Sequence, residues 1–174
     1  MQLVTRVFTL ALAQSFIPSH TYVVSTGLPA GLYGWGRGLA WYAIGLLDTW
    51  RALPDSHPGK ADLTASVVSF ATMSLAFQNA NGSWCWQITN SSSRFDSSTT
   101  AVLAWFLSEA TVLPSLEVAA LAGSANALAY LRTVTRRTGA IDFSQGDTKS
   151  IGVYSQHFDV LPFTQGFCLR ALTI

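Results

Sequence analysis

Residues 32–50 read LYGWGRGLAWYAIGLLDTW, in which glycines alternate with Trp35 and Arg37 ahead of a mainly apolar run. From Gly38 onward the apolar residues recur at spacings of three and four, as they do on one face of a helix. The stretch therefore predicts an amphipathic helix over Gly38–Leu53, with Trp35, Arg37 and Trp41 at its N-terminal end.

Helical spacing of apolar residues recurs in five further blocks, separated by clusters of Gly, Pro, Asn and Ser. The sequence thus predicts six helices, over Gln2–Phe16, Gly38–Leu53, Lys60–Gln78, Ser98–Thr111, Leu116–Arg137 and Leu161–Leu172. Two short segments, SWCWQI at 83–88 and GAIDF at 139–143, roughly alternate apolar and polar residues as strands do. We expect an all-α fold of helical hairpins, in one domain over residues 1–174.

Long loops that contain Trp, Arg, His and Gln alternate with short turns along the chain. The long loops cover Ile17–Arg37, Asn79–Ser97 and Thr138–Val160. In antiparallel hairpins joined in series, these loops emerge at the same end of the helices. We therefore expect them to share a cleft.

The composition excludes several classes of partner. The formal net charge is +1, and the one basic cluster is Arg132, Arg136 and Arg137, so no nucleic-acid surface is predicted. The apolar runs are shorter than the roughly 20 residues that cross a bilayer, so no membrane span is predicted. Cys85 and Cys168 lack the spacing of metal ligands, and free thiols are favoured over a bridge.

The start of the Gly38–Leu53 helix has the chemistry to bind an acidic sugar. Its unpaired N–H groups and the positive end of its dipole stabilise an anion, and the guanidinium of Arg37 fits a carboxylate. Trp41 lies four residues after Arg37 and shares its face, so a sugar ring could stack on the indole. The alternative is that Trp41 is a core residue and that Arg37 binds neighbouring carbonyl groups.

The other long loops hold further polar candidates. In the second loop Trp84 and Trp86 alternate, and Asp96 either caps the next helix or faces the cleft. The third loop and the helix after it contain Asp147, Tyr154, His157, Asp159 and Gln165. His157 and Asp159 suggest an acid and base pair, although such residues are more often solvated. The sequence has neither a serine nucleophile motif nor a cluster at metal-ligand spacing.

Four segments together resemble glycoside hydrolase family 105, the unsaturated rhamnogalacturonyl hydrolases, and more distantly the family 88 unsaturated glucuronyl hydrolases. They are GLYGWGRGLAWYAIGLLDTWRALP at 31–54, GSWCWQI at 82–88, RFDSSTTA at 94–101 and GDTKSIGVYSQHFDVLPFTQGFCLRAL at 146–172. The resemblance implies an (α/α)6 barrel of six helical hairpins. It also implies removal of a 4,5-unsaturated uronic sugar from pectin fragments by hydration of the C4=C5 double bond, with no metal or other cofactor.

The resemblance also implies substrate-binding residues. Trp35, Arg37 and Trp41 match the family's W-x-R-G-x-x-W motif, and His20 matches the histidine of an H-x-Y/W-D motif whose aspartate position here is Val23. Gln165 matches the glutamine of a Y/F-x-Q-G segment, and Trp86 is added from GSWCWQI.

The family's general acid is an aspartate that precedes the W-x-R-G motif, and residues 1–47 contain no Asp or Glu. Six helices make three hairpins, about half of the implied barrel. We therefore expect a C-terminal portion of such a hydrolase, which binds the unsaturated uronate-containing oligosaccharide with little turnover. The alternatives are a non-catalytic carbohydrate-binding remnant that dimerises through its open helical face, and a helical scaffold.

Overall fold

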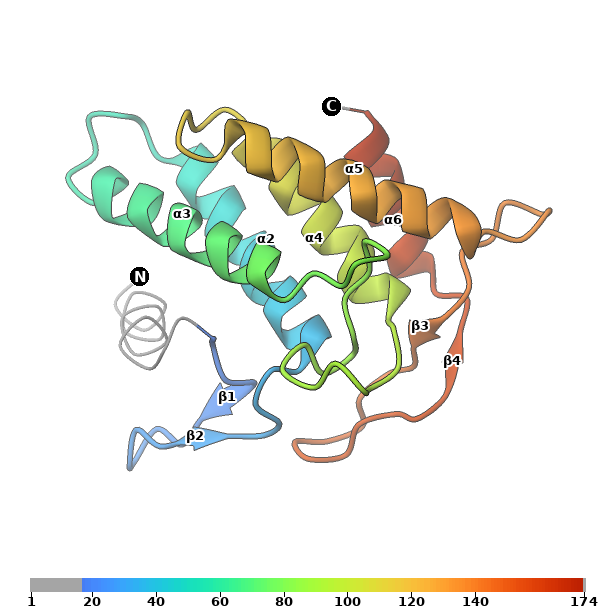
Figure 1. The fold of residues 1–174 in the computed structure, drawn as a ribbon. Coiled ribbons are helices and arrows are strands. Elements are labelled where there is room, and N and C mark those ends of the chain that lie inside the picture. Colours follow the sequence, from blue (N-terminus) through green and yellow to red (C-terminus); the bar gives the residue numbers. More distant parts are fainter. Residues whose placement is uncertain (1–16, 174) are drawn as a thin grey trace.

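The computed structural model describes residues 17–173 of the chain, in which helices predominate (Figure 1). In chain order the elements are β1 (Thr21–Tyr22), β2 (Pro29–Ala30), α2 (Gly36–Ala52), α3 (Lys60–Ala76), α4 (Ser97–Ala110), α5 (Glu117–Thr133), β3 (Ser144–Gln145), β4 (Phe158–Asp159) and α6 (Pro162–Leu172). The predicted all-α fold is confirmed. The helix predicted over Gln2–Phe16 lies outside the described residues.

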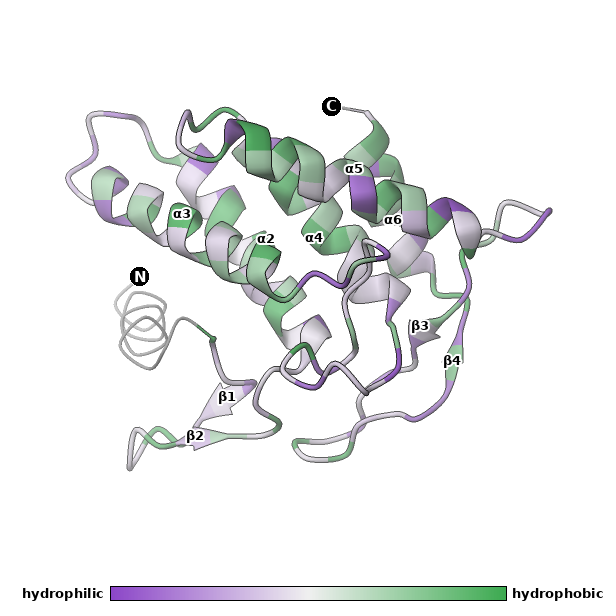
Figure 2. Cartoon of the chain, viewed as in Figure 1, coloured by the Kyte–Doolittle hydropathy of each residue, from purple (hydrophilic) through white to green (hydrophobic). Residues whose placement is uncertain are grey.

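Helix α4 is the centre of the molecule, and it contacts α2, α3, α5 and α6. Every residue from Ser97 to Leu107 is buried, because apolar or small side chains lie on all sides of this helix. Figure 2 shows the hydrophobic residues concentrated in the helices, whereas the loops are more mixed. The α2, α4 and α6 helices thus form one layer, since α4 packs between the other two, and α3 and α5 pack against that layer.

The fifth predicted helix is shorter than expected. Helix α5 ends at Thr133 rather than at Arg137, because the chain reverses there into a tight turn. The N–H of Arg136 donates to the carbonyl of Ala140 at 2.8 Å, and Gly139 supplies the positive φ of +85° that the turn requires. The GAIDF segment forms only an isolated bridge, between Thr135 and Ile141, so it is not a strand.

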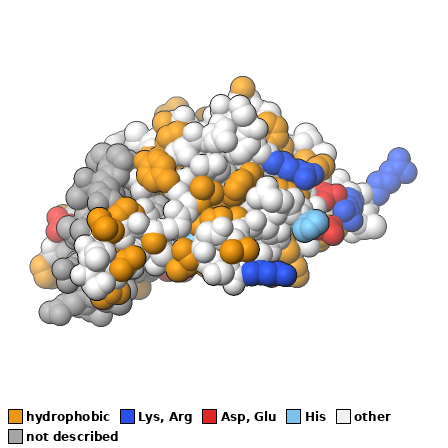
Figure 3. Space-filling model, turned by 90° about the horizontal axis from the view of Figure 1, so that it is seen from below, with side chains coloured by type: hydrophobic (Ala, Val, Ile, Leu, Met, Phe, Trp, Pro, Cys, Tyr) orange, Lys and Arg blue, Asp and Glu red, His pale blue; other side chains and the backbone are white. Residues whose placement is uncertain are grey.

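The long loops meet at one end of the helices, as predicted (Figure 1). β1 pairs antiparallel with β2, and β3 pairs antiparallel with β4. The second loop joins both of its neighbours, since Trp35 forms a bridge with Gln87 and the ring centroids of Trp86 and Tyr154 lie 6.3 Å apart. Seen from this end, charged side chains are few, and most of those visible lie toward the right of the view (Figure 3).

Two other sequence predictions can be compared with the structure. Cys85 is buried and Cys168 is partly buried, and both are free thiols, as favoured from the sequence. Over residues 17–173, no helix is both long and apolar enough to pass through a bilayer.

Candidate functional site

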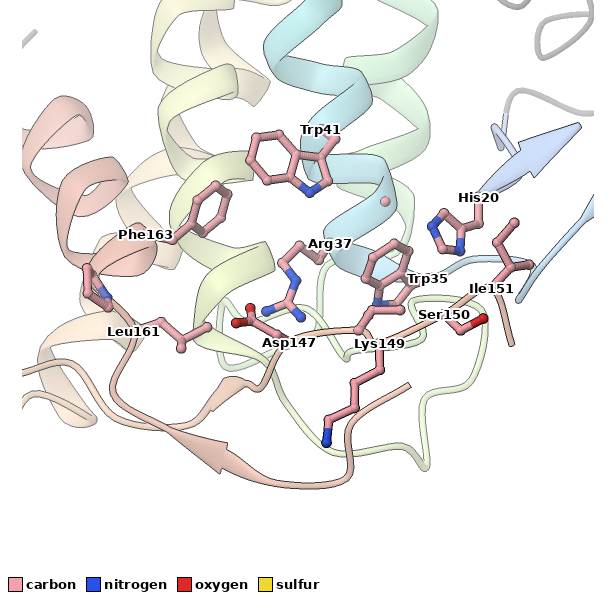
Figure 4. A pocket seen from close by; sticks show the side chains of 13 residues that line it. His20, Trp35, Arg37, Trp41, Asp147, Lys149, Ser150, Ile151, Leu161 and Phe163 are labelled. Atoms are coloured by element: carbon pink, nitrogen blue, oxygen red, sulfur yellow. The ribbon is translucent and has the colours of Figure 1, made fainter. Parts of the chain in front are cut away.

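A cavity of about 750 Å³ opens at the loop end, between the start of α2, the first loop, the segment after β3 and the start of α6 (Figure 4). Its volume lies in the range of small-molecule sites, about 300–1,000 Å³. The residues that line it are His20, Trp35, Arg37, Gly38, Trp41, Asp147, Thr148, Lys149, Ser150, Ile151, Leu161, Pro162 and Phe163. Four of the six predicted substrate-binding residues are therefore brought together.

Arg37 lines the cavity but is only 5% exposed. Its Nη1 and Nη2 groups donate to the backbone carbonyls of Gln145 and Gly146, so the interpretation that Arg37 binds neighbouring carbonyls is correct. Burial lowers the pKa of Arg37, whereas the charges of Asp96 and Asp147 act in the opposite direction. The two hydrogen bonds use two of the five N–H groups of a guanidinium, so a role in ligand binding remains a prediction.

Trp35 is also largely buried, and Gln145 of β3 fixes its orientation. The indole Nε1 donates to Oε1 of Gln145 at 2.9 Å. The ring also packs against His20, with centroids 4.3 Å apart. A Cβ on Gly38 would lie 2.8 Å from Cε3 of this indole, which explains why the turn of helix beside the indole carries a glycine.

Trp41 is 56% exposed, so the interpretation that it is a core residue is wrong. Its ring packs against Phe163 at the start of α6, with centroids 5.0 Å apart. These two aromatic rings form one wall of the cavity (Figure 4). Tryptophan at the surface of a cavity, backed by a second ring, provides a flat apolar face for a ligand.

His20 lines the cavity on the side opposite Phe163 (Figure 4). Its Nδ1 lies 2.8 Å from the Tyr154 hydroxyl oxygen, which also accepts the N–H of Leu32 at 2.6 Å. Burial lowers the pKa of His20, which favours the neutral imidazole.

Asp96, the residue before α4, holds a neighbouring part of the site in place through hydrogen bonds. Its carboxylate is fully buried and accepts the N–H groups of Ser98 and Thr99 at 3.0 and 3.2 Å, so the predicted cap of α4 is confirmed. It also accepts the N–H of Gln145 at 2.9 Å. The N-terminus of α4 therefore holds Gln145, which in turn contacts both Trp35 and Arg37.

Two of the predicted substrate-binding residues do not reach the cavity. Trp86 does not line it, and its ring lies near that of Tyr154 instead. Gln165 instead lines a smaller cavity of about 200 Å³ between α5 and α6. Phe163, two residues earlier, takes the position at the main cavity, because Gln165 faces another side of α6.

Sequence reasoning missed the contributions of Lys149 and Gln145. Lys149 lies two residues after Asp147 in the loop after β3, and both residues line the cavity. Figure 4 shows Asp147 next to Arg37, whereas the side chain of Lys149 extends away from Arg37 and Trp41. The presence of Asp147 in that loop was the only local indication. The suggested acid and base pair is not formed at the cavity, because Asp159 pairs with Arg136 at 3.3 Å and His157 is absent from the lining. Within the described part of the chain, no three His, Cys, Asp or Glu residues are grouped so that they could hold a metal ion.

The family assignment agrees with this geometry. Residues 31–151, more than half of the chain, match the model of Glycosyl Hydrolase Family 88. The chain therefore belongs to glycosyl hydrolase family 88, and the resemblance found in the sequence is confirmed. No curated protein sequence matches it.

Solved structures with the same fold come from families 105 and 88. A possible member of family 105 from Klebsiella pneumoniae has a TM-score of 0.73 at 17% identity, covering 99% of this chain and 49% of that one. A family 105 glycoside hydrolase from C. acetobutylicum has a TM-score of 0.69 at 20% identity, with coverages of 86% and 47%. The unsaturated glucuronyl hydrolase from Bacillus sp. GL1 has a TM-score of 0.63 at 22% identity, with coverages of 84% and 42%. This chain spans less than half the length of each, so its helices correspond to part of a six-hairpin glycosidase fold.

Proposed function

We propose that the cavity binds the terminal 4,5-unsaturated uronic sugar of an oligosaccharide, and that the protein serves in the removal of this sugar by hydration of its C4=C5 double bond. The observation that supports this most directly is the exposed ring of Trp41, packed against the half-buried Phe163, in the same cavity as the guanidinium of Arg37. An apolar sugar face packs on aromatic rings, and a carboxylate is stabilised by a nearby cation.

The charges around the cavity fit an acidic ligand. Arg37 and Lys149 supply two positive charges, and Asp147 is the one carboxylate among the described lining residues. The N-terminus of α2 adds the positive end of its helix dipole, because α2 begins at Gly36 beside the cavity. A uronate is therefore bound more favourably here than a neutral sugar of the same size.

Turnover needs an acid that delivers a proton to the double bond. The family resemblance places this acid before the W-x-R-G motif, where the sequence contains no carboxylate. Asp48 lies in α2 near Arg170, outside the cavity lining, and Asp147, which lines the cavity, comes from the later segment after β3 and does not occupy the position of that acid in the chain. A missing general acid reduces the rate by roughly 10²- to 10⁴-fold. We therefore propose that these 174 residues bind the sugar and hydrate it slowly.

An unsaturated galacturonyl disaccharide tests both parts of this proposal. We expect calorimetry to detect its binding, and the ultraviolet absorbance of its double bond to persist. A neutral disaccharide of the same size is the matched control and should bind more weakly, because it lacks the carboxylate. Rapid loss of absorbance would contradict the proposed lack of a catalytic acid, and absence of binding would contradict the sugar site.

The pectin or rhamnogalacturonan origin of the substrate is a finer proposal, carried by the resemblance to family 105. Structural neighbours include an unsaturated glucuronyl hydrolase responsible for the degradation of glycosaminoglycan and one specific for heparin. A parallel titration with an unsaturated glucuronyl disaccharide separates the two substrate classes. Tighter binding of the galacturonyl compound supports a pectin-type substrate.

Replacing Trp41 with alanine tests the aromatic wall of the cavity. We expect the affinity for the unsaturated disaccharide to fall about two- to tenfold, because aromatic stacking contributes about 0.5–1.5 kcal/mol. The thermal midpoint should change little, since the side chain is more than half exposed. Titration calorimetry and a melting curve measure the two effects. Unchanged affinity would show that the sugar does not contact this indole.

A second candidate is a non-catalytic carbohydrate-binding protein that dimerises through an open helical face. The supporting observation is the exposure of Leu169 and Leu172 on α6, which are 64% and 53% exposed. Exposed apolar side chains of neighbouring turns favour association. Sugar binding without turnover, in a protein that elutes as a dimer from a sizing column, would favour this candidate.

A further inference from the structure

Tyr154 lies between β3 and β4, and its side chain joins separate parts of the site. Its hydroxyl oxygen accepts the N–H of Leu32 at 2.6 Å and lies 2.8 Å from Nδ1 of His20. Its ring centroid is 5.1 Å from that of Trp35. The hydroxyl is therefore held in place from the first loop and from the start of α2.

The hydrogen-bond requirements of these groups determine where the proton of His20 resides. A phenol has one hydrogen to donate, and the N–H of Leu32 already occupies one acceptor position on the Tyr154 oxygen. If that hydrogen points to Nδ1 of His20, both groups are satisfied and Nδ1 is the acceptor. If Nδ1 carried the proton instead, the hydroxyl hydrogen of Tyr154 would have no acceptor within residues 17–173.

We infer that Tyr154 is a positioning residue, whose hydroxyl keeps the His20 proton on Nε2 so that the neutral imidazole donates a hydrogen bond to a sugar in the cavity. Figure 4 shows the two ring nitrogens of His20 pointing in different directions, one of them toward the side where Arg37 lies. In a neutral imidazole the hydrogen bond at one nitrogen fixes the role of the other. The part that concerns the sugar rests on the proposed function.

The backbone of the first loop is adapted to this contact. Gly31 has a φ of +84°, and a Cβ there would lie 2.8 Å from Cβ of His20 and 2.9 Å from the Tyr154 hydroxyl oxygen. A side chain at this position would push the two residues apart. The close approach of His20 and Tyr154 therefore depends on a glycine at position 31.

The charged side chains of the cavity do not contact His20 directly. Arg37, Asp147 and Lys149 line the same cavity, and none of them makes an ion pair with His20 among the described residues. The burial that lowers the pKa of His20 also acts in favour of the neutral ring. The hydrogen bonds of Tyr154 thus favour a proton on Nε2 of His20, and the burial of His20 favours the neutral ring.

Nitrogen-15 spectra of the full 174-residue chain, labelled at histidine, test this inference. We expect His20 in the wild-type protein to show a protonated Nε2 and an unprotonated Nδ1 at a pH well above about 6.5, the usual pKa of histidine. His57 is an internal reference, because its Nδ1 accepts the N–H of Gly59 at 3.1 Å and its proton must lie on Nε2. The His20 signals are assigned by their loss in His20→Gln. A protonated Nδ1 in wild-type His20 would overturn the inference.

Tyr154→Phe removes the hydroxyl and keeps the ring. We expect His20 to become a mixture of both tautomers while His57 is unchanged, and the affinity for the unsaturated disaccharide to fall about fivefold. Tyr33→Phe removes a hydroxyl from an exposed tyrosine outside the cavity lining. It should change neither the tautomer of His20 nor the affinity for the disaccharide. An unaltered His20 tautomer in Tyr154→Phe would overturn the inference. If the tautomer shifts but the wild-type protein binds no uronide, the positioning role stands and the sugar assignment fails.

Discussion

Replacing Asp96 with alanine is expected to lower the free energy of unfolding by about 4 kcal/mol. The carboxylate is fully buried and accepts the backbone N–H groups of Ser98, Thr99 and Gln145. Loss of the cap costs about 1–2 kcal/mol, and each buried donor left without a partner adds about 1–3 kcal/mol. The effect is large because α4 contacts four other helices.

Chemical denaturation followed by circular dichroism measures this change. Asp55→Ala is the matched control, since its side chain is fully exposed and should leave the unfolding midpoint near that of the wild type. Asp96→Asn keeps one acceptor oxygen and should lie between the two. If Asp96→Ala unfolded at the same denaturant concentration as Asp55→Ala, the proposed support of the site by α4 would be wrong.

Replacing Arg37 with alanine is expected to weaken binding of the unsaturated disaccharide about 100-fold. The guanidinium supplies positive charge to the cavity and also donates to the carbonyls of Gln145 and Gly146. Hydrogen bonds from charged groups contribute about 1.5–3 kcal/mol each, so the variant loses both the charge and the anchor of the loop that carries Asp147 and Lys149.

Titration calorimetry of three arginine variants separates these contributions. Arg37→Lys keeps the charge but lacks the planar fork that spans two carbonyls, so an intermediate loss of affinity is expected. Arg132→Ala is the matched control, because Arg132 lines the smaller cavity and not the main one. Circular dichroism shows whether Arg37→Ala remains folded. Wild-type affinity in a folded Arg37→Ala protein would show that the guanidinium does not contribute to sugar binding.

The thermal midpoints of the same variants distinguish the two roles of Arg37. Because Arg37 is 5% exposed and its guanidinium binds two carbonyls, its removal should destabilise the protein even without sugar. Trp41→Ala should lower affinity without this loss of stability, since Trp41 is largely exposed. The pair of variants therefore compares a ligand contact that also supports the fold with one that does not.

The sequence by itself determined the helices that the structure describes, α2 to α6, and the end of the molecule at which the site lies. Apolar residues at helical spacing, such as Leu39, Ala43 and Leu46, are local features, and all three are buried in α2. The predicted starts of α3 and α4 agree with the structure to within one residue. The alternation of long and short connections placed the polar loops together, because neighbouring helices in hairpins run in opposite directions.

Only the tertiary structure decided which of the candidate side chains face the cavity. Trp84 and Trp41 are both tryptophans near Gly-rich turns, yet Trp84 is fully buried against α3 and Trp41 is exposed. Gln145 acquires its role through a hydrogen bond to Trp35, 110 residues away in the chain, which no local pattern indicates. The spacing of apolar residues in the sequence indicates which face of a helix is buried. Which side chains pack against that face depends on how segments distant in the sequence come together.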